Sequence, residues 1–191
     1  MTYPETTDID FKENVQAALE QQSRARSNDD ALRGREYSAG NLFEDVADGA
    51  SVGILFEMPA SAERFAFVDS RFSITGKWYV QKVDSVTKDS AGTSIEPNNR
   101  LISDGDASAT AEYGASVSGG NEWSRKVVGS ASGQGGNLSL SPATSNGSAV
   151  IIQPGENVYV VAENNSNGDA DVSIDVDWTE TPISEIEELV E

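Results

Sequence analysis

Acidic side chains are the main groups in this chain that could carry chemistry, because its 191 residues include no histidine and no cysteine. Without these two residue types, hydrolase triads and the common zinc sites are excluded. A pair of carboxylates, as used in glycoside hydrolysis, is still chemically available. Since the chain has 32 acidic residues, no single pair stands out, and we expect no enzymatic activity.

One stretch has part of the spacing of a calcium-binding loop. Glu163, Asn165 and Asn167 fall at the first, third and fifth positions of an EF-hand loop. The twelfth position is Ile174, where a bidentate glutamate is needed, and the flanking segments are expected strands. We therefore expect a hairpin turn rather than a calcium site. No cofactor is expected, although weakly bound Na⁺, K⁺ or Ca²⁺ stays an open alternative where acidic side chains crowd.

Three tryptophans could provide a platform for a sugar ring. Trp78 and Trp178 lie within strand patterns, which favours packing in a core. Trp123, close to Gly119 and Gly120, is the one expected at the surface. An exposed platform there would favour an alternative function, a secreted carbohydrate- or calcium-binding β-sandwich module of a halophile.

The charge of the chain indicates the solvent it works in. Its 13 basic residues leave a formal net charge of −19, and no lysine or arginine follows Lys126. Such a charge destabilises a compact state at ordinary ionic strength, whereas molar salt shortens the Debye length to about 3 Å. We expect a protein adapted to a very salty solvent, with no nucleic-acid partner. No long apolar segment or basic, apolar leader is present, so neither membrane insertion nor a signal peptide is expected.

Most of the chain after residue 36 carries strand patterns, with β-branched and aromatic residues bounded by Gly, Pro and Ser. Near the end, Val172, Ile174, Val176 and Trp178 alternate with polar residues, which predicts one core face and one acidic face. About eight short strands without alternating helices predict an all-β, antiparallel, jelly-roll-like sandwich. The expected strands are 51–58, 64–70, 71–83, 107–117, 122–129, 137–141, 148–153, 157–163 and 170–179, with a long polar stretch at 84–106.

The expected organisation is an N-terminal arm (1–36), the sandwich (37–180) and an acidic tail (181–191). An amphipathic helix is predicted over residues 10–26, because Phe11, Val15 and Leu19 form one apolar stripe. Four basic residues follow within twelve positions: Arg24, Arg26, Arg33 and Arg35. This stretch is either a solvated linker or an arm that pairs with acidic faces of neighbouring subunits.

The acidic tail, residues 181–191, also allows two interpretations. Ile183, Ile186 and Leu189 have helical spacing, which predicts either a short docking helix or a frayed end.

Several short motifs resemble a known family. They are Gly40-Asn41-Leu42-Phe43, the segment 54–59 ending in Pro59, the segments 92–100 and 129–136, and the closing pair of segments 152–160 and 172–178. In this order they resemble jelly-roll virion proteins that decorate the capsids of tailed phages and related archaeal viruses. The likeness covers about three quarters of the chain and rests on pattern rather than on an invariant signature.

With the acidic composition, the resemblance implies a structural protein of a virus of halophilic archaea. It would be made in the host cytoplasm and located in the virion, as a homo-oligomer in contact with other capsid proteins. The N-terminal helix, the arginine-rich stretch and the acidic tail are not part of the family pattern. They leave open whether the subunit decorates a shell or forms it.

Overall fold

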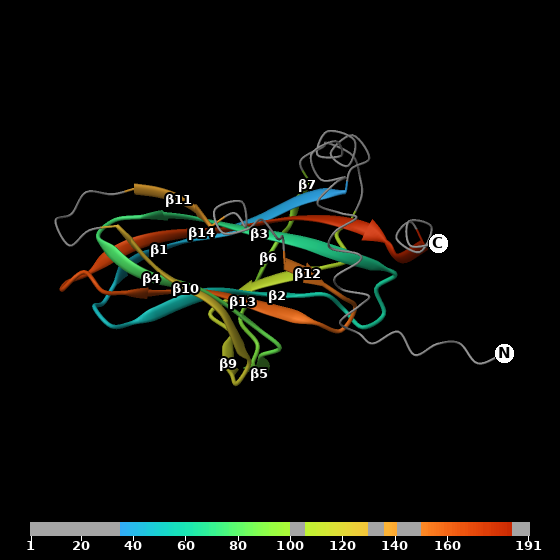
Figure 1. The fold of residues 1–191 in the computed structure, drawn as a ribbon, viewed down its shortest axis with the longest axis horizontal. Helices are drawn as coiled ribbons and strands as arrows, with labels where there is room; N and C mark the ends of the chain where they lie inside the picture. Colours follow the sequence, from blue (N-terminus) through green and yellow to red (C-terminus); the bar gives the residue numbers. More distant parts are fainter. Residues whose placement is uncertain (1–34, 100–105, 130–135, 141–149, 185–191) are drawn as a thin grey trace.

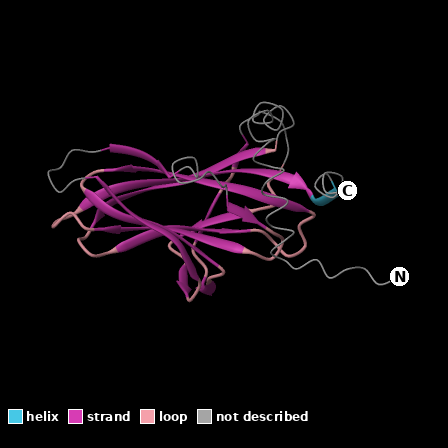
Figure 2. Cartoon of the chain, viewed as in Figure 1, coloured by secondary structure: helices cyan, strands magenta, loops and turns pink. Residues whose placement is uncertain are grey.

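The computed structural model describes residues 35–99, 106–129, 136–140 and 150–184, and the side chains of all of these except 123–125 and 136–140. This part of the chain is all-β, as expected, and every strand pairing in it is antiparallel (Figure 1). No complete helix lies within it; a helical turn begins at residues 183–184, where the description ends (Figure 2).

The described residues form fourteen strands rather than about eight. They are β1 (Glu36–Val46), β2 (Ser51–Glu57), β3 (Arg64–Ile74), β4 (Lys77–Asp84), β5 (Thr87–Ser90), β6 (Thr93–Ile95), β7 (Asn98–Asn99), β8 (Thr110–Tyr113), β9 (Ser116–Ser118), β10 (Asn121–Gly129), β11 (Gly136–Leu140), β12 (Val150–Ile152), β13 (Asn157–Asn164) and β14 (Ala170–Pro182).

Two six-stranded sheets face each other and share one core. Sheet A has the order β11-β3-β14-β1-β7, with β12 also paired to β3; sheet B has the order β10-β4-β13-β2-β8-β6. The indole of Trp178 in sheet A stacks on Tyr37, with 5.6 Å between ring centroids. The same indole meets the ring of Phe56 in sheet B edge-on at 5.1 Å. Aromatic contacts therefore join the two layers in the interior.

The pattern of β14 agrees with the sequence prediction. Val172, Ile174, Val176 and Trp178 are buried in the core, whereas the side chains between them lie on the outer face of sheet A. Because successive side chains of a strand point to opposite faces, Asp171, Asp175 and Asp177 share that outer face, whereas Glu180 near the end of β14 is buried.

The predicted strands 64–70 and 71–83 were divided at the wrong residue. One strand, β3, runs through residues 64–74, and the next, β4, begins at Lys77. The chain turns at Gly76 instead, which has a φ of 78°. A β-carbon at Gly76 would collide with the Ser166 hydroxyl, so this corner needs glycine both for its backbone conformation and for the close approach.

The polar stretch 84–106 contains three short strands that the pattern did not predict. Of these, β5 pairs with β9 to form a small sheet C, and β6 and β7 extend the edges of sheets B and A. Sheet C covers Leu55 on the outer face of sheet B through Val86 and Ala115. These strands lack apolar alternation because little of their surface faces the main core.

The segment between β13 and β14 is a turn, but it is not the predicted hairpin, because these strands belong to different sheets. Asn167 adopts the left-handed conformation with a φ of 61°. The buried amide of Asn164 donates hydrogen bonds to the carbonyls of Val46, at 2.6 Å, and Gly168, at 2.8 Å. The side chain that opens this turn therefore ties it to the end of β1.

Both ends of the described sandwich lie close together. Glu36, where β1 begins, is paired with Thr179 near the end of β14. The expected helix over residues 10–26 lies outside the described residues. No helix in the described part of the chain is long and apolar enough to cross a membrane.

Candidate functional site

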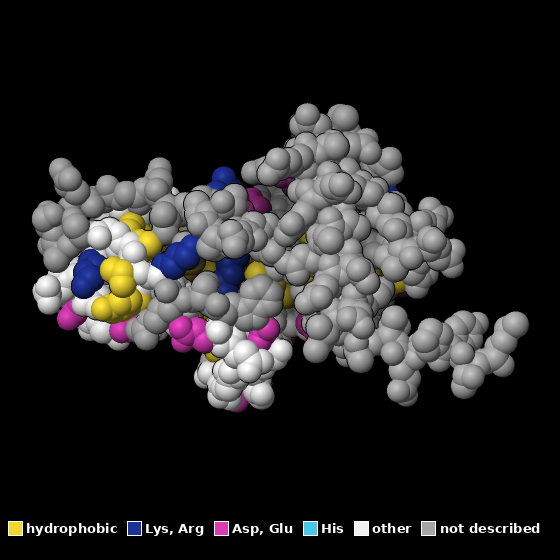
Figure 3. All heavy atoms as spheres, in the orientation of Figure 1, with side chains coloured by type: hydrophobic (Ala, Val, Ile, Leu, Met, Phe, Trp, Pro, Cys, Tyr) yellow, Lys and Arg dark blue, Asp and Glu magenta, His cyan; other side chains and the backbone are white. Residues whose placement is uncertain are grey.

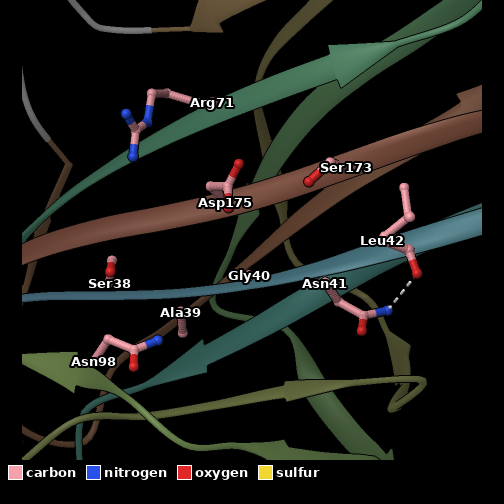
Figure 4. Close-up of a pocket in the computed structure, with 9 residues that line it drawn as sticks. All are labelled: Ser38, Ala39, Gly40, Asn41, Leu42, Arg71, Asn98, Ser173 and Asp175. Atoms are coloured by element: carbon pink, nitrogen blue, oxygen red, sulfur yellow. Dashed lines mark hydrogen bonds between the residues drawn. The ribbon is translucent and has the colours of Figure 1, made fainter.

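A shallow, open groove lies on the outer face of sheet A, and we call it the Gly40 groove. Its lining residues come from β1, β3, β7 and β14 (Figure 4): Ser38, Ala39, Gly40, Asn41, Leu42, Arg71, Asn98, Ser173 and Asp175. Residues about 135 positions apart meet here because β1 and β14 are neighbours, with Gly40 paired to Asp175 and Leu42 to Ser173.

The floor of the groove depends on the absence of a side chain at Gly40. A β-carbon there would collide with a carboxylate oxygen of Asp175, so this carboxylate lies directly over the glycine backbone. Figure 4 shows Asp175 between Arg71 of β3 and Gly40 of β1. Glycine at this position therefore leaves room for the Asp175 carboxylate to pack against the backbone of β1.

Arg71 does not neutralise Asp175 directly, because it forms an ion pair with Asp177. Its Nε lies 2.8 Å from one carboxylate oxygen of Asp177, and its Nη2 donates to the other at 3.0 Å. This two-point geometry is the strong form of the arginine–carboxylate pair. Within the described residues, no hydrogen bond or ion pair reaches the carboxylate of Asp175.

Burial raises the pKa of Asp175 above its ordinary value; Arg71 lowers it and Asp177 raises it. Burial is the largest of these effects, which means that the carboxylate has lost water without gaining a full counter-charge. The other polar groups lining the groove, besides Arg71, are the hydroxyls of Ser38 and Ser173 and the amides of Asn41 and Asn98. Such a site suits a ligand that carries positive charge and several hydrogen-bond donors.

The rim of the groove carries an exposed apolar side chain, Leu42. It is 57% exposed and is one of two large hydrophobic residues found at the surface of the described chain. Asn41 donates from its side-chain amide to the Leu42 carbonyl at 3.2 Å, which helps to hold this part of β1. A ligand in the groove would therefore meet an apolar contact beside the acid.

The fully buried acid Glu180 has a structural role. Its carboxylate accepts hydrogen bonds from the backbone N–H of Ser108, at 2.8 Å, and of Ala109, at 2.9 Å. It also accepts from the indole of Trp178 at 3.2 Å and pairs with Arg64 at 3.3 Å. These contacts satisfy the charge and tie the segment before β8 to sheet A, so the group is not free for chemistry.

Lys82 is a buried cation on the inner face of sheet B. It is 6% exposed, and burial lowers its pKa; the charge of Asp69 raises that pKa, and Lys126 lowers it. Lys126 is paired with Val80 on β4, so both lysines lie on the side of the sheet that faces the core. Figure 3 shows Lys and Arg side chains at the surface in the same region of the view where Figure 1 labels β4 and β10.

Most residues singled out in the sequence lie outside the described part of the chain, namely Phe11, Val15, Leu19, Arg24, Arg26, Arg33, Ile186 and Leu189. Arg35 is described, and its carbonyl accepts a hydrogen bond from the Glu180 N–H at 3.0 Å. Ile183 packs against Phe65, and its N–H donates to the Glu63 carbonyl at 3.1 Å. The structure thus places only the inner ends of the two terminal segments.

Two of the three tryptophans that could form a sugar platform are core residues. Trp78 and Trp178 are buried in the core, as predicted, and the side chain of Trp123 lies outside the description. The described residues contain no group of three or more acidic, histidine or cysteine side chains placed to hold a metal ion. The Gly40 groove was not predicted, although the alternating acids of β14 and the glycine in the family-like motif were signals for it.

No protein-family model matches the chain, and no curated protein matches its sequence.

Proposed function

We propose that this chain is a non-enzymatic structural subunit of a virion, from a virus of halophilic archaea, and that its sandwich is a jelly roll. It would serve as a capsid or capsid-decoration subunit that assembles with copies of itself and with other capsid proteins. The terminal segments would make the assembly contacts. The sequence motifs described above and the acidic composition support the viral and halophilic parts of this proposal.

The strand order of the two sheets is the observation that carries the proposal. In sheet A, β1 and β14 are neighbours, followed by β3 and then β11 and β12; in sheet B, β2, β13, β4 and β10 follow one another. The chain changes sheet between β1, β2, β3 and β4, and again from β10 to β11, β12 to β13 and β13 to β14. This order is the one expected for a double Greek key, and jelly rolls with such wrapping are typical of viral capsid proteins, and also of lectins and cupins.

The position of the chain ends supports assembly through the termini. Because Glu36 pairs with Thr179, residues 1–34 and 185–191 are attached at the same end of sheet A. Two segments of opposite character therefore start from one place, an arginine-rich one and an acidic one. Repeated contacts through such segments can build a symmetric lattice.

Light scattering coupled to size-exclusion chromatography tests this function, in about 2–3 M salt and again at low salt. We expect an oligomer in high salt that becomes a folded monomer when residues 1–34 are deleted. Arg35 is kept because its carbonyl accepts a hydrogen bond from the Glu180 N–H. A monomer of the full chain at every salt concentration would contradict self-assembly and would favour the carbohydrate- or calcium-binding module.

A further inference from the structure

The Gly40 groove contains a carboxylate that makes no hydrogen bond within the described part of the chain. This half-buried group, Asp175, also has no ion-pair partner among the described residues, since Arg71 is turned to Asp177. Two serine hydroxyls and two asparagine amides, which can donate or accept, line the same space. A partially desolvated charge of this kind is stabilised by an opposite charge that also donates hydrogen bonds.

A guanidinium group fits these features better than an ammonium group. It has five donors in a planar fork, which can bind a carboxylate at two points and still reach neighbouring acceptors. The methylene stem of an arginine also packs on apolar surface while its head stays polar. Leu42 provides such a surface at the rim, where it is otherwise exposed without an evident packing role.

The chain itself contains a segment of matching charge. Arg24 and Arg26 belong to the arginine-rich stretch, in a protein that has only 13 basic residues against 32 acidic ones. Both lie at the end of the helix predicted over residues 10–26, where side chains two residues apart point to different sides, so one of the two can face the groove at a time. Of Asp175 and Asp177 on the outer face of β14, Asp177 is already paired with Arg71, which leaves Asp175 as the acceptor for one guanidinium.

We infer that the segment around Arg24 and Arg26 of one copy docks on the Gly40 groove of a second copy, with one of the two guanidinium groups on Asp175. This inference rests on the proposed self-assembly and names the surface that receives the arm. The groove is open on the outer face of sheet A, which leaves it accessible to a second copy.

A groove is also the kind of acceptor that a salty solvent requires. At a Debye length of about 3 Å, attraction between separated surface charges is screened, whereas contact pairs that are partly removed from water are screened much less. The Asp175 carboxylate lies against the Gly40 backbone, and Leu42 adds an apolar side chain at the rim. An arginine bound between them would form a contact pair that is partly removed from water. An exposed acidic patch would not hold an arginine segment under these conditions.

A mixing experiment with two variants tests the docking. The arm variant carries Arg24→Ser and Arg26→Ser, and the groove variant carries Asp175→Asn; each should assemble with a dissociation constant about ten- to hundredfold higher than that of the unmodified chain. Mixed in equal amounts, they should form a one-to-one complex, because the intact arm of the groove variant meets the intact groove of the arm variant. Asp169→Asn is the matched control, since it removes an exposed acid outside the groove.

Each outcome separates this inference from the proposed function. If the full chain assembles and loses assembly without residues 1–34, but Asp175→Asn assembles like Asp169→Asn, the groove is not the acceptor and self-assembly still stands. If both variants are impaired but their mixture stays monomeric, the arm docks within its own copy and the inference is wrong. If the full chain never assembles, the proposed function fails first.

Discussion

At the scale of single residues, Lys82 stands out because the burial of its charged side chain destabilises the folded state. Its side chain is buried on the inner face of sheet B, beside Lys126, and burial lowers its pKa. The described residues show no ion pair with this ammonium, although the charge of Asp69 raises its pKa. An unpaired charge away from water is costly.

Replacing Lys82 with methionine should therefore raise the free energy of unfolding, by about 1–3 kcal/mol, because the stem stays packed and the charge is removed. The measurement is chemical denaturation in high salt at neutral pH. The gain should shrink as the pH rises through the folded pKa of Lys82 towards 10.5, the ordinary lysine value, where neither state is charged. Lys77→Met is the control, because Lys77 lies over the ring of Tyr79 on the outer face, 5.7 Å from its centroid. An equal gain in both variants would contradict the role of burial.

Fully buried Glu180 shows the opposite arrangement for a charged residue. Its carboxylate is surrounded by donors from Ser108, Ala109, Trp178 and Arg64, so the cost of burial is offset by hydrogen bonds. Whether a buried charge stabilises or destabilises this protein thus depends on the partners that the fold supplies.

At the scale of elements, Lys88 of sheet C forms ion pairs with sheet B, in addition to the apolar contacts of Val86 and Ala115 with Leu55. Lys88 of β5 donates to Glu57 of β2 at 2.8 Å and to Glu112 of β8 at 2.9 Å. Glu112 also accepts from the Gly92 N–H at 3.0 Å. The hydrogen bond from Lys88 is the main reason that the pKa of Glu112 is below its ordinary value.

Lys88→Met should destabilise the protein by about 1–3 kcal/mol, because it leaves two carboxylates facing each other without their shared donor. Hydrogen exchange followed by mass spectrometry compares the variant with the wild type. The substitution should increase the exchange rate in β5 and β9 more than in β13. Since the folded pKa of Glu112 is lowered, its contribution is present above pH 4.5 and is lost as the pH falls through the folded pKa. The difference between wild type and variant should therefore shrink in acid. Uniform exchange changes in all strands would show that sheet C is not a separate unit.

At the scale of the whole molecule, the net charge of −19 decides how stability responds to salt. Repulsion between acidic side chains opposes the compact state at low ionic strength and is screened when the Debye length falls from about 10 Å to about 3 Å. We expect the free energy of unfolding to rise steadily from about 0.1 M to about 1 M salt. Denaturation by urea across a series of NaCl concentrations measures this rise, because urea itself does not change the ionic strength. Stability that is independent of salt would contradict adaptation to a salty solvent.

Much of the architecture was predictable from the local sequence pattern. Alternation over residues 172–178 predicted β14 and its two faces, because the side-chain period of a strand is two residues. Trp78 and Trp178 were correctly predicted to be core residues for the same reason. The strands β5, β6 and β7 were missed, since short polar edge strands carry no such pattern.

What the sequence determined by itself was therefore the all-β class, the apolar faces that must be buried, the lack of histidine and cysteine chemistry, and the net charge of −19. What only the tertiary structure decided was which strands are neighbours. The Gly40 groove needs β1 beside β14, and the ion pairs between sheets C and B need Lys88 within reach of two strands. Local pattern records which way a side chain points, but pairing between distant strands depends on register and layer packing, which no single segment contains.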